Sequence, residues 1–138
     1  MPPQAPDAAA PARILVIDDD PALLTTLSRI LASEGFGVEV ATDGAEGLAR
    51  ARAQPPTVVL LDLHLPVLDG YAFLEAFRSL PACAEVPVVL MTGSQDTASA
   101  RRRITARRVV VLLAKPFDVD TLLATVRGAA RAARPQAP

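Results

Sequence analysis

Short apolar runs alternate along this chain with segments in which apolar residues recur every three or four positions. The short apolar runs predict five strands, at Arg13–Ile17, Val38–Ala41, Thr57–Leu61, Val86–Met91 and Val109–Leu113. Three of these runs have no polar alternation, which is typical of strands covered on both faces. The periodic segments predict five helices, at Pro21–Glu34, Gly44–Ala53, Gly70–Leu80, Gln95–Ala106 and from Asp118 or Asp120 to about Ala130.

Residues at the predicted boundaries support these helices. Asp20, Asp43 and Asp69 each stand directly before a predicted helix, where a side-chain oxygen can accept a hydrogen bond from a free backbone N–H group. Either Asp118 or Asp120 can do the same for the last helix. Four of the five helices therefore have a capping residue at their start.

Strict alternation of strand and helix with short links predicts a doubly wound α/β fold with a parallel sheet. We expect the five-stranded flavodoxin-like order 2-1-3-4-5, a (βα)5 arrangement. Ligands in such sheets bind at the carboxyl ends of the strands, where the strand order reverses. The predicted domain spans residues 13–131, between Pro/Ala-rich tails at 1–12 and 132–138 that we expect to be disordered.

Composition agrees with one globular domain, since 51% of the 138 residues are apolar and 21% are charged. Cys83 is the only cysteine, which excludes an intrachain disulfide and fits a reducing cytoplasm. The N-terminal residues do not resemble a signal peptide, and no apolar stretch approaches the roughly 18 residues of a membrane span. We therefore expect a cytoplasmic protein without membrane contact. The net charge of −1 does not argue for direct binding of nucleic acid.

Charge is distributed unevenly along the chain. Residues 1–92 carry 5 Lys/Arg against 12 Asp/Glu, whereas residues 93–138 carry 9 against 3. Most of the positive excess comes from five arginines, namely Arg101, Arg102, Arg103, Arg107 and Arg108. Such a cluster is either a solvated helix face or a docking surface for an acidic partner, and the sequence leaves both interpretations open.

Five polar side chains stand at or just past the carboxyl ends of four predicted strands. They are Asp18, Asp19, Asp62, Thr92 and Lys115, and Pro116 follows the lysine. In a parallel sheet these positions meet at one edge, which would bring three carboxylates, a hydroxyl and an ammonium group into one pocket.

When three carboxylates lie this near to one another, the pKa of at least one of them is raised, unless a cation is bound. Oxygen ligands without a His/Cys cluster favour a hard ion, and Mg²⁺ fits best because it takes few carboxylates and retains several waters. An aspartate beside a metal and an ammonium group is a candidate nucleophile for phosphoryl transfer. The metal and Lys115 would offset charge on the transferring oxygens, and Thr92 could donate a hydrogen bond to one of them.

These residues resemble the receiver domain of two-component response regulators over about Arg13–Ala130. The resemblance rests on four segments, Ile14–Pro21, Leu60–Gly70, Met91–Gly93 and Lys115–Phe117. It implies that Asp62 accepts phosphate from a phosphohistidine on a sensor histidine kinase or a histidine phosphotransfer protein. It also implies that the chain catalyses only its own phosphorylation and dephosphorylation.

The resemblance further implies a role for each residue of the pocket. Asp19 would bind Mg²⁺ directly and Asp18 through water, and the backbone carbonyl of His64 would complete the metal site with Asp62. Thr92 and Lys115 would hold the phosphoryl group. The Lys115–Pro116 peptide bond would be cis.

Some positions depart from the family pattern. Leu112 stands where the family usually has Tyr or Phe, an aromatic ring that moves on activation, so signalling is expected to differ while the chemistry is intact. Gly93 replaces the usual alanine after the threonine, and Arg108-Val109 replaces a common Gly-Ala. His64, the only histidine, is either an exposed loop residue or a residue that tunes hydrolysis of the aspartyl phosphate.

The main hypothesis is a single-domain regulator, because nothing long enough for a DNA-binding domain follows Ala130. It would dock to a partner protein, or dimerise, through its fourth helix, fifth strand and fifth helix, where the arginines lie. The alternative is a receiver-like scaffold that has lost dependence on phosphorylation, which Leu112 favours. An aspartate-nucleophile phosphatase fits less well, although Asp18 and Asp20 have its spacing. A flavin binder fits least, because three aspartates after the first strand would repel its phosphate.

Overall fold

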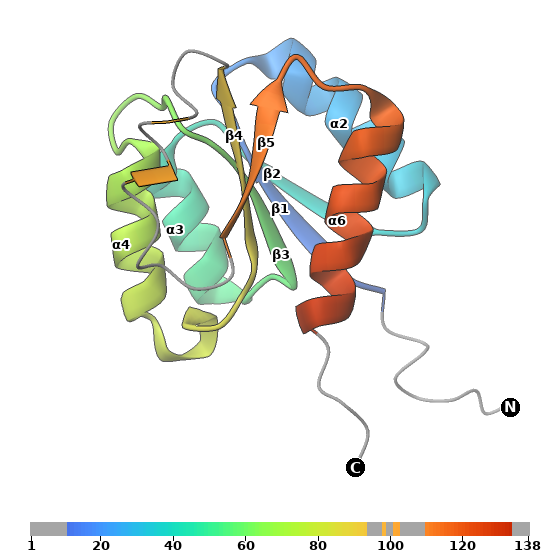
Figure 1. Cartoon of the computed structure of the whole chain (residues 1–138). Helices are drawn as coiled ribbons and strands as arrows, with labels where there is room; N and C mark the ends of the chain where they lie inside the picture. The colour runs from blue at the N-terminus through green and yellow to red at the C-terminus, as the bar shows by residue number, and fades with distance from the viewer. Residues whose placement is uncertain (1–10, 94–97, 99–100, 103–109, 134–138) are drawn as a thin grey trace, which may run out of the picture.

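Five parallel strands form one sheet through the centre of the part of the chain that the structure describes (Figure 1). This computed structural model describes residues 11–93, 98, 101–102 and 110–133. The strands are β1 (Arg13–Ile17), β2 (Gly37–Ala41), β3 (Val58–Asp62), β4 (Val88–Gly93) and β5 (Val110–Lys115). Their order is β2-β1-β3-β4-β5, so the predicted flavodoxin-like order 2-1-3-4-5 is confirmed.

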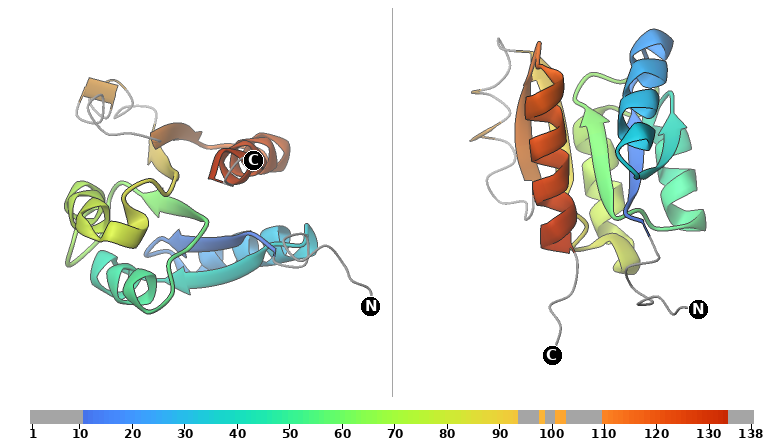
Figure 2. Two further views of the ribbon diagram at one scale, coloured as in Figure 1. Left: turned by 90° about the horizontal axis from the view of Figure 1, so that it is seen from below. Right: turned by 90° about the vertical axis from the view of Figure 1, so that its right-hand side faces the viewer.

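Helices cover both faces of the sheet (Figures 1 and 2). They are α2 (Pro21–Ser33), α3 (Gly44–Ala53), α4 (Gly70–Ser79) and α6 (Val119–Ala133), with a short 3-10 helix η1 (Pro81–Cys83) that the sequence did not predict. Helices α2 and α6 pack on one face, and α3 and α4 on the other. The helix predicted at 95–106 lies outside the described residues except for Ala98, Arg101 and Arg102.

Alternate residues of each strand enter the two hydrophobic clusters, one on each face of the sheet. In β1, Ile14 and Val16 face α2 and α6, whereas Leu15 and Ile17 face α3 and α4, and all four are at most 1% exposed. A strand buried on both faces needs apolar residues at successive positions, which is why these runs lack polar alternation. The buried centre of the sheet fixes where its carboxyl edge lies.

The domain extends slightly beyond its predicted limits at both ends. Helix α6 runs to Ala133 rather than to about Ala130, so residues 132 and 133, assigned to a tail, are helical. Alanine and arginine are strong helix formers and carry the helix on. At the other end, Ala12 is buried and its carbonyl accepts a hydrogen bond from the N–H of Gly37 (2.9 Å). The rest of the two predicted tails, residues 1–10 and 134–138, lies outside the described residues.

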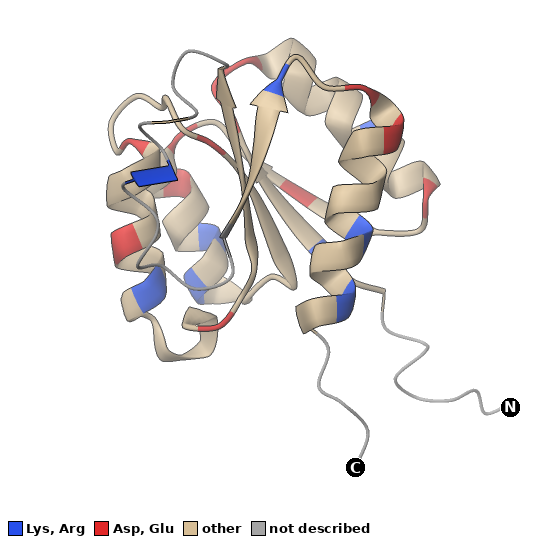
Figure 3. Cartoon of the chain, in the orientation of Figure 1, with Lys and Arg blue, Asp and Glu red and all other residues tan. Residues whose placement is uncertain are grey.

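Several acidic positions, red in Figure 3, lie along the upper edge of the molecule, where the strands end and the helices begin. Asp20, Asp43, Asp69 and Asp118 each accept a hydrogen bond from a backbone N–H group in the first turn of a helix. The N-cap predictions are thus confirmed, with Asp118 as the cap of α6. Negative charge at helix N-termini complements the helix dipoles. This edge is therefore acidic for reasons of local structure, before any chemistry is considered.

Candidate functional site

Three of the predicted carboxylates lie together at the carboxyl edge of the sheet. The side chains of Asp18, Asp19 and Asp62 each offer an oxygen atom, and these oxygens lie within 4.8 Å of one another. Strands β1 and β3 are neighbours, with Ile17 beside Leu61, so the residues that follow them emerge side by side. Asp18 is 1% exposed and Asp62 7%, whereas Asp19 is exposed.

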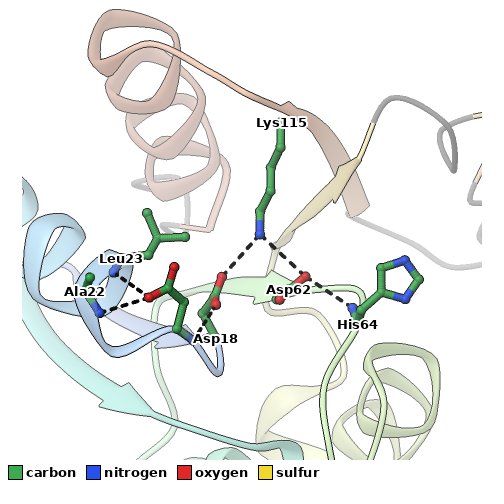
Figure 4. Close-up of polar contacts among 7 residues, drawn as sticks. Asp18, Ala22, Leu23, Asp62, His64 and Lys115 are labelled. Atoms are coloured by element: carbon green, nitrogen blue, oxygen red, sulfur yellow. Dashed lines mark hydrogen bonds and ion pairs between the residues drawn. The ribbon is translucent and has the colours of Figure 1, made fainter.

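Lys115 reaches across the sheet edge from the end of β5 (Figure 4). Its Nζ lies 3.4 Å from Oδ2 of Asp18 and 3.7 Å from Oδ1 of Asp62. The ammonium group therefore stands between two buried carboxylates from different strands. The Lys115–Pro116 peptide bond is cis, as the family resemblance implied.

Backbone N–H groups hold the two buried carboxylates in place. The N–H of Asp20 donates to Oδ1 of Asp18 (2.9 Å), and the N–H of His64 donates to Oδ1 of Asp62 (3.1 Å). Figure 4 shows the imidazole of His64 turned away from Asp62, so this residue meets the site through its backbone. The His64 side chain is exposed, in agreement with the simpler of its two sequence interpretations.

Burial raises the pKa of Asp62 above its ordinary value of 3.8, and the neighbouring charges of Asp18 and Asp19 raise it further. The hydrogen bond from His64 and the charge of Lys115 act in the opposite direction. An aspartate in this environment is a perturbed carboxylate beside a specific cationic partner, which is typical of functional sites.

Thr92 and Leu112 lie on the neighbouring strands β4 and β5, where Leu112 pairs with Leu90, two residues before Thr92. Thr92 is 1% exposed, and its hydroxyl donates to the carbonyl of Gly93 (3.2 Å). In the register of the sheet Asp62 pairs with Met91, which places Thr92 one residue beyond the phosphoacceptor candidate. Leu112 is half-buried and packs against the cluster under α3 and α4.

The loop between β3 and α4 contains features that the sequence interpretation missed. Val67 has a φ of 69°, and the N–H of Leu68 donates to the carbonyl of Pro66 (2.7 Å), which makes a γ-turn. Gly70 approaches the backbone closely, because a Cβ there would lie 2.8 Å from the carbonyl oxygen of Leu63. The Pro66-Val67 pair signals a turn in the sequence, but it does not reveal a left-handed valine.

The donor set fits a hard divalent cation. Among the described residues, the Asp18, Asp19 and Asp62 group is the one that could hold a metal through three side chains. All its donors are oxygens, one carboxylate is exposed and two are buried, and the local charge is −3 against a single ammonium group. Mg²⁺ prefers such oxygen ligands and retains waters on its open side.

The sheet order and the acidic pocket at its switch point define a flavodoxin-like domain with a carboxylate site. The family model described as "Response regulator receiver domain" matches residues 14–127 of this chain. The chain therefore belongs to the response regulator receiver domain family. Receiver domains are phosphorylated by histidine kinases or phosphotransfer proteins in two-component signalling, and they bind Mg²⁺ at a cluster of aspartates.

Solved structures and curated relatives agree with this assignment. The chemotaxis response regulator CheY4 of Vibrio cholerae superposes with a TM-score of 0.81 at 30% identity, over 87% of this chain and 99% of that one. The receiver domain of NtrX from Brucella abortus gives a TM-score of 0.78 at 30% identity, over 86% of this chain and 98% of that one.

Two similar curated proteins are named as DNA-binding regulators. The response regulator MtrA of Mycolicibacterium smegmatis is 38% identical over 86% of this chain and 50% of its own length. The transcriptional regulator RpaA of Synechocystis sp. is 36% identical over 86% of this chain and 49% of its own length. The chain thus spans about half the length of these relatives, and the expectation of no direct contact with nucleic acid finds no support in them. In the part of the chain that the structure describes, none of the helices is long and apolar enough to cross a membrane.

Proposed function

We propose that this chain is a phosphorylation-controlled signalling module whose phosphoacceptor is Asp62. The observation that carries the proposal is the placement of Asp62 beside two further carboxylates, with the Lys115 ammonium 3.7 Å from its Oδ1. The phosphodonor would be a phosphohistidine on a sensor kinase or a phosphotransfer protein. Apart from adding and losing its own phosphoryl group, the chain would catalyse no reaction.

In the proposed reaction a carboxylate oxygen of Asp62 attacks the phosphorus of the donor. The P–N bond to the imidazole breaks as the P–O bond forms, and the imidazole nitrogen retains the electron pair. Bound Mg²⁺, held by Asp18, Asp19, Asp62 and the backbone carbonyl of His64, would offset negative charge on the transferring oxygens. Lys115 neutralises part of the same charge from the other side of the pocket.

Thr92 is the proposed hydroxyl donor to the phosphorylated state. Its hydroxyl now donates to the Gly93 carbonyl, at a position one residue beyond the strand partner of Asp62. A rotation of the side chain would redirect this donor toward a phosphoryl oxygen. Such a local exchange of hydrogen bonds would couple phosphorylation to the backbone of β4.

The proposed output is docking to a partner protein in the cytoplasm. Dimerisation through the same surface is a second proposed output. The surface assigned to it includes β5, whose Val111 is 45% exposed, and Arg101 and Arg102, which are exposed. Arg103, Arg107 and Arg108 of the same cluster lie outside the described residues. Leu112, half-buried against the core, supports the alternative that partner binding does not depend on phosphate.

The test is the intact mass of the chain after incubation with acetyl phosphate and Mg²⁺, beside the Asp62→Asn variant. One phosphoryl adduct is expected on the wild type, and none on the variant or without Mg²⁺. A folded wild type that takes neither an adduct nor a beryllofluoride mimic would refute the proposal and favour the phosphate-independent scaffold. The mimic covers the case of an aspartyl phosphate that hydrolyses before it is weighed.

A further inference from the structure

Two glycines contact the β3–α4 loop at places where no side chain would fit. At Gly44, the first residue of α3, a Cβ would stand 2.3 Å from the carbonyl oxygen of Leu68 and 2.9 Å from its Cβ. At Gly70 a Cβ would stand 2.9 Å from the carbonyl oxygen of Asp62. Gly70 ends the loop itself, whereas Gly44 belongs to a helix that supplies no side chain to the site.

The β3–α4 loop is anchored by apolar contacts on both sides of a γ-turn. Leu65 and Leu68 pack against the cluster under α3 and α4, on either side of the γ-turn at Val67. A β-branched residue rarely adopts a positive φ, and the Val67 side chain is 83% exposed, so its own packing does not stabilise this conformation. The contacts on both sides therefore keep the turn in place, and the Gly44–Leu68 contact is one of them.

We propose that Gly44 is a positioning residue for the phosphoacceptor site. The same loop carries His64, whose N–H lies 3.1 Å from Oδ1 of Asp62. Because Gly44 has no side chain, the Leu68 carbonyl can lie against α3. This contact fixes the path of the loop and therefore the position of the His64 N–H relative to the Asp62 carboxylate. This inference rests on the proposed function, because it concerns the geometry of that site.

A methyl group at position 44 would displace the loop. Ordinary contacts of a Cβ begin at 3.4 Å, so the Leu68 carbonyl oxygen at 2.3 Å would have to move by about 1 Å. That oxygen is a backbone atom and cannot rotate away as the end of a side chain can. Functional groups must stay within about 0.5 Å of their productive positions, so a shift of this size reaches the site.

The experiment measures Mg²⁺ affinity by isothermal titration calorimetry in the wild type and in Gly44→Ala. We expect affinity to fall by about tenfold, the lower end of the effect of losing a group that orients a metal ligand. The amide NMR signals of His64 and Val67 should also shift in the Mg²⁺-free protein. Unchanged Mg²⁺ affinity in a folded Gly44→Ala would overturn the inference.

Gly47→Ala is the matched control, because it makes the same change in the same helix. A Cβ at Gly47 would meet Cδ1 of Ile17 at 2.5 Å, which is the end of a buried side chain and not a backbone atom of the β3–α4 loop. We expect this variant to retain wild-type Mg²⁺ affinity whatever its effect on thermal stability. Equal losses of affinity in both variants would show a general effect of repacking α3 and would refute a specific role for Gly44.

A second pair of variants tests the contact if Gly44→Ala does not fold. Asp43 caps α3 by accepting a hydrogen bond from the N–H of Glu46 (2.8 Å). Asp43→Ser and Asp43→Ala both remove its charge, but only serine retains a capping oxygen. The weaker cap should loosen the first turn around Gly44, so Asp43→Ala should bind Mg²⁺ more weakly than Asp43→Ser. Equal affinities would overturn the inference.

The outcome for the wild type separates this inference from the proposed function. Suppose that the wild type accepts phosphate from acetyl phosphate and that Gly44→Ala binds Mg²⁺ as tightly as the wild type. That result leaves the proposed function intact and refutes only the positioning role. A wild type that neither binds Mg²⁺ nor takes a phosphoryl group refutes the proposed function, and the inference with it.

Discussion

Replacing Asp62 by asparagine should stabilise the Mg²⁺-free protein, even though it removes the proposed phosphoacceptor. Asp62 is 7% exposed and shares its pocket with two further carboxylates. Burial and these neighbours raise its pKa. The folded protein therefore binds a proton at Asp62 more tightly than the unfolded chain does, and ionisation at neutral pH costs folding free energy.

The size of this cost follows from the distances. At an effective dielectric constant of about 20, a carboxylate at the 4.8 Å limit from Asp62 costs about 3.5 kcal/mol, and the ammonium at 3.7 Å returns about 4.5 kcal/mol. For two such carboxylates the sum is unfavourable by about 2.5 kcal/mol. Solvent reduces this cost because Asp19 is exposed, whereas burial of the Asp62 charge adds to it. We expect Asp62→Asn to gain about 1–2 kcal/mol at pH 7, or roughly 4 °C in melting temperature.

The assay is thermal unfolding by circular dichroism for the wild type and Asp62→Asn between pH 7 and pH 4, without divalent cations. The advantage of the variant should be largest above the raised pKa of Asp62 and should shrink as the pH falls toward the ordinary value of 3.8, where the unfolded carboxylate also takes up a proton. Asp120→Asn, which changes an exposed carboxylate, should give no such gain. An Asp62→Asn variant that melts below the wild type at pH 7, or an advantage independent of pH, would refute the reasoning.

Three further predictions concern the same edge of the sheet. Mg²⁺ at 100 times its dissociation constant should stabilise the wild type by about 2.7 kcal/mol, measured as a rise in melting temperature. An equal rise in Asp19→Asn would contradict the proposed metal site. Val67→Asn should raise the free energy of unfolding in urea by about 1 kcal/mol, because asparagine tolerates a positive φ and little packing is lost with the exposed valine. A lower unfolding midpoint would count against strain at this turn. His64→Ala should leave the rate of aspartyl phosphate hydrolysis unchanged, because the imidazole is exposed and turned away from Asp62. The rate is followed as loss of the intact-mass adduct, and a change of a few fold would show that the imidazole tunes the reaction.

The relatives share the receiver domain with this chain but differ from it in length. The receiver domain is shared with proteins twice as long, some of which are named as DNA-binding. The pocket residues are supplied by β3, β4, β5 and the segments that follow β1 and β3, all within this chain, so the proposed phosphorylation can be tested on it. What the phosphorylated surface binds remains a separate experiment, for which the Asp62→Asn variant supplies the control.

The sequence by itself determined the sheet, its strand order and the edge at which Asp18, Asp62 and Lys115 meet. Short apolar runs without alternation are typical of strands buried on both faces, aspartates before helices act as caps, and parallel strands bring their carboxyl ends to one edge. Those rules are local or topological, so they can be applied without coordinates. The predicted end of α6 fell three residues short, although Pro135, two residues beyond Ala133, is a stop signal that the sequence offers.

Only the tertiary structure decided how the loop after Asp62 is held. The fit of Gly44 against Leu68 joins residues that are 24 positions apart, and the positive φ of Val67 arises because contacts on both sides of it compete with its own backbone preference. Likewise, the bond of the Thr92 hydroxyl to Gly93 and the position of Lys115 between two carboxylates depend on side-chain rotamers. Residue types and spacing predict which groups meet, but close packing among distant segments sets their distances.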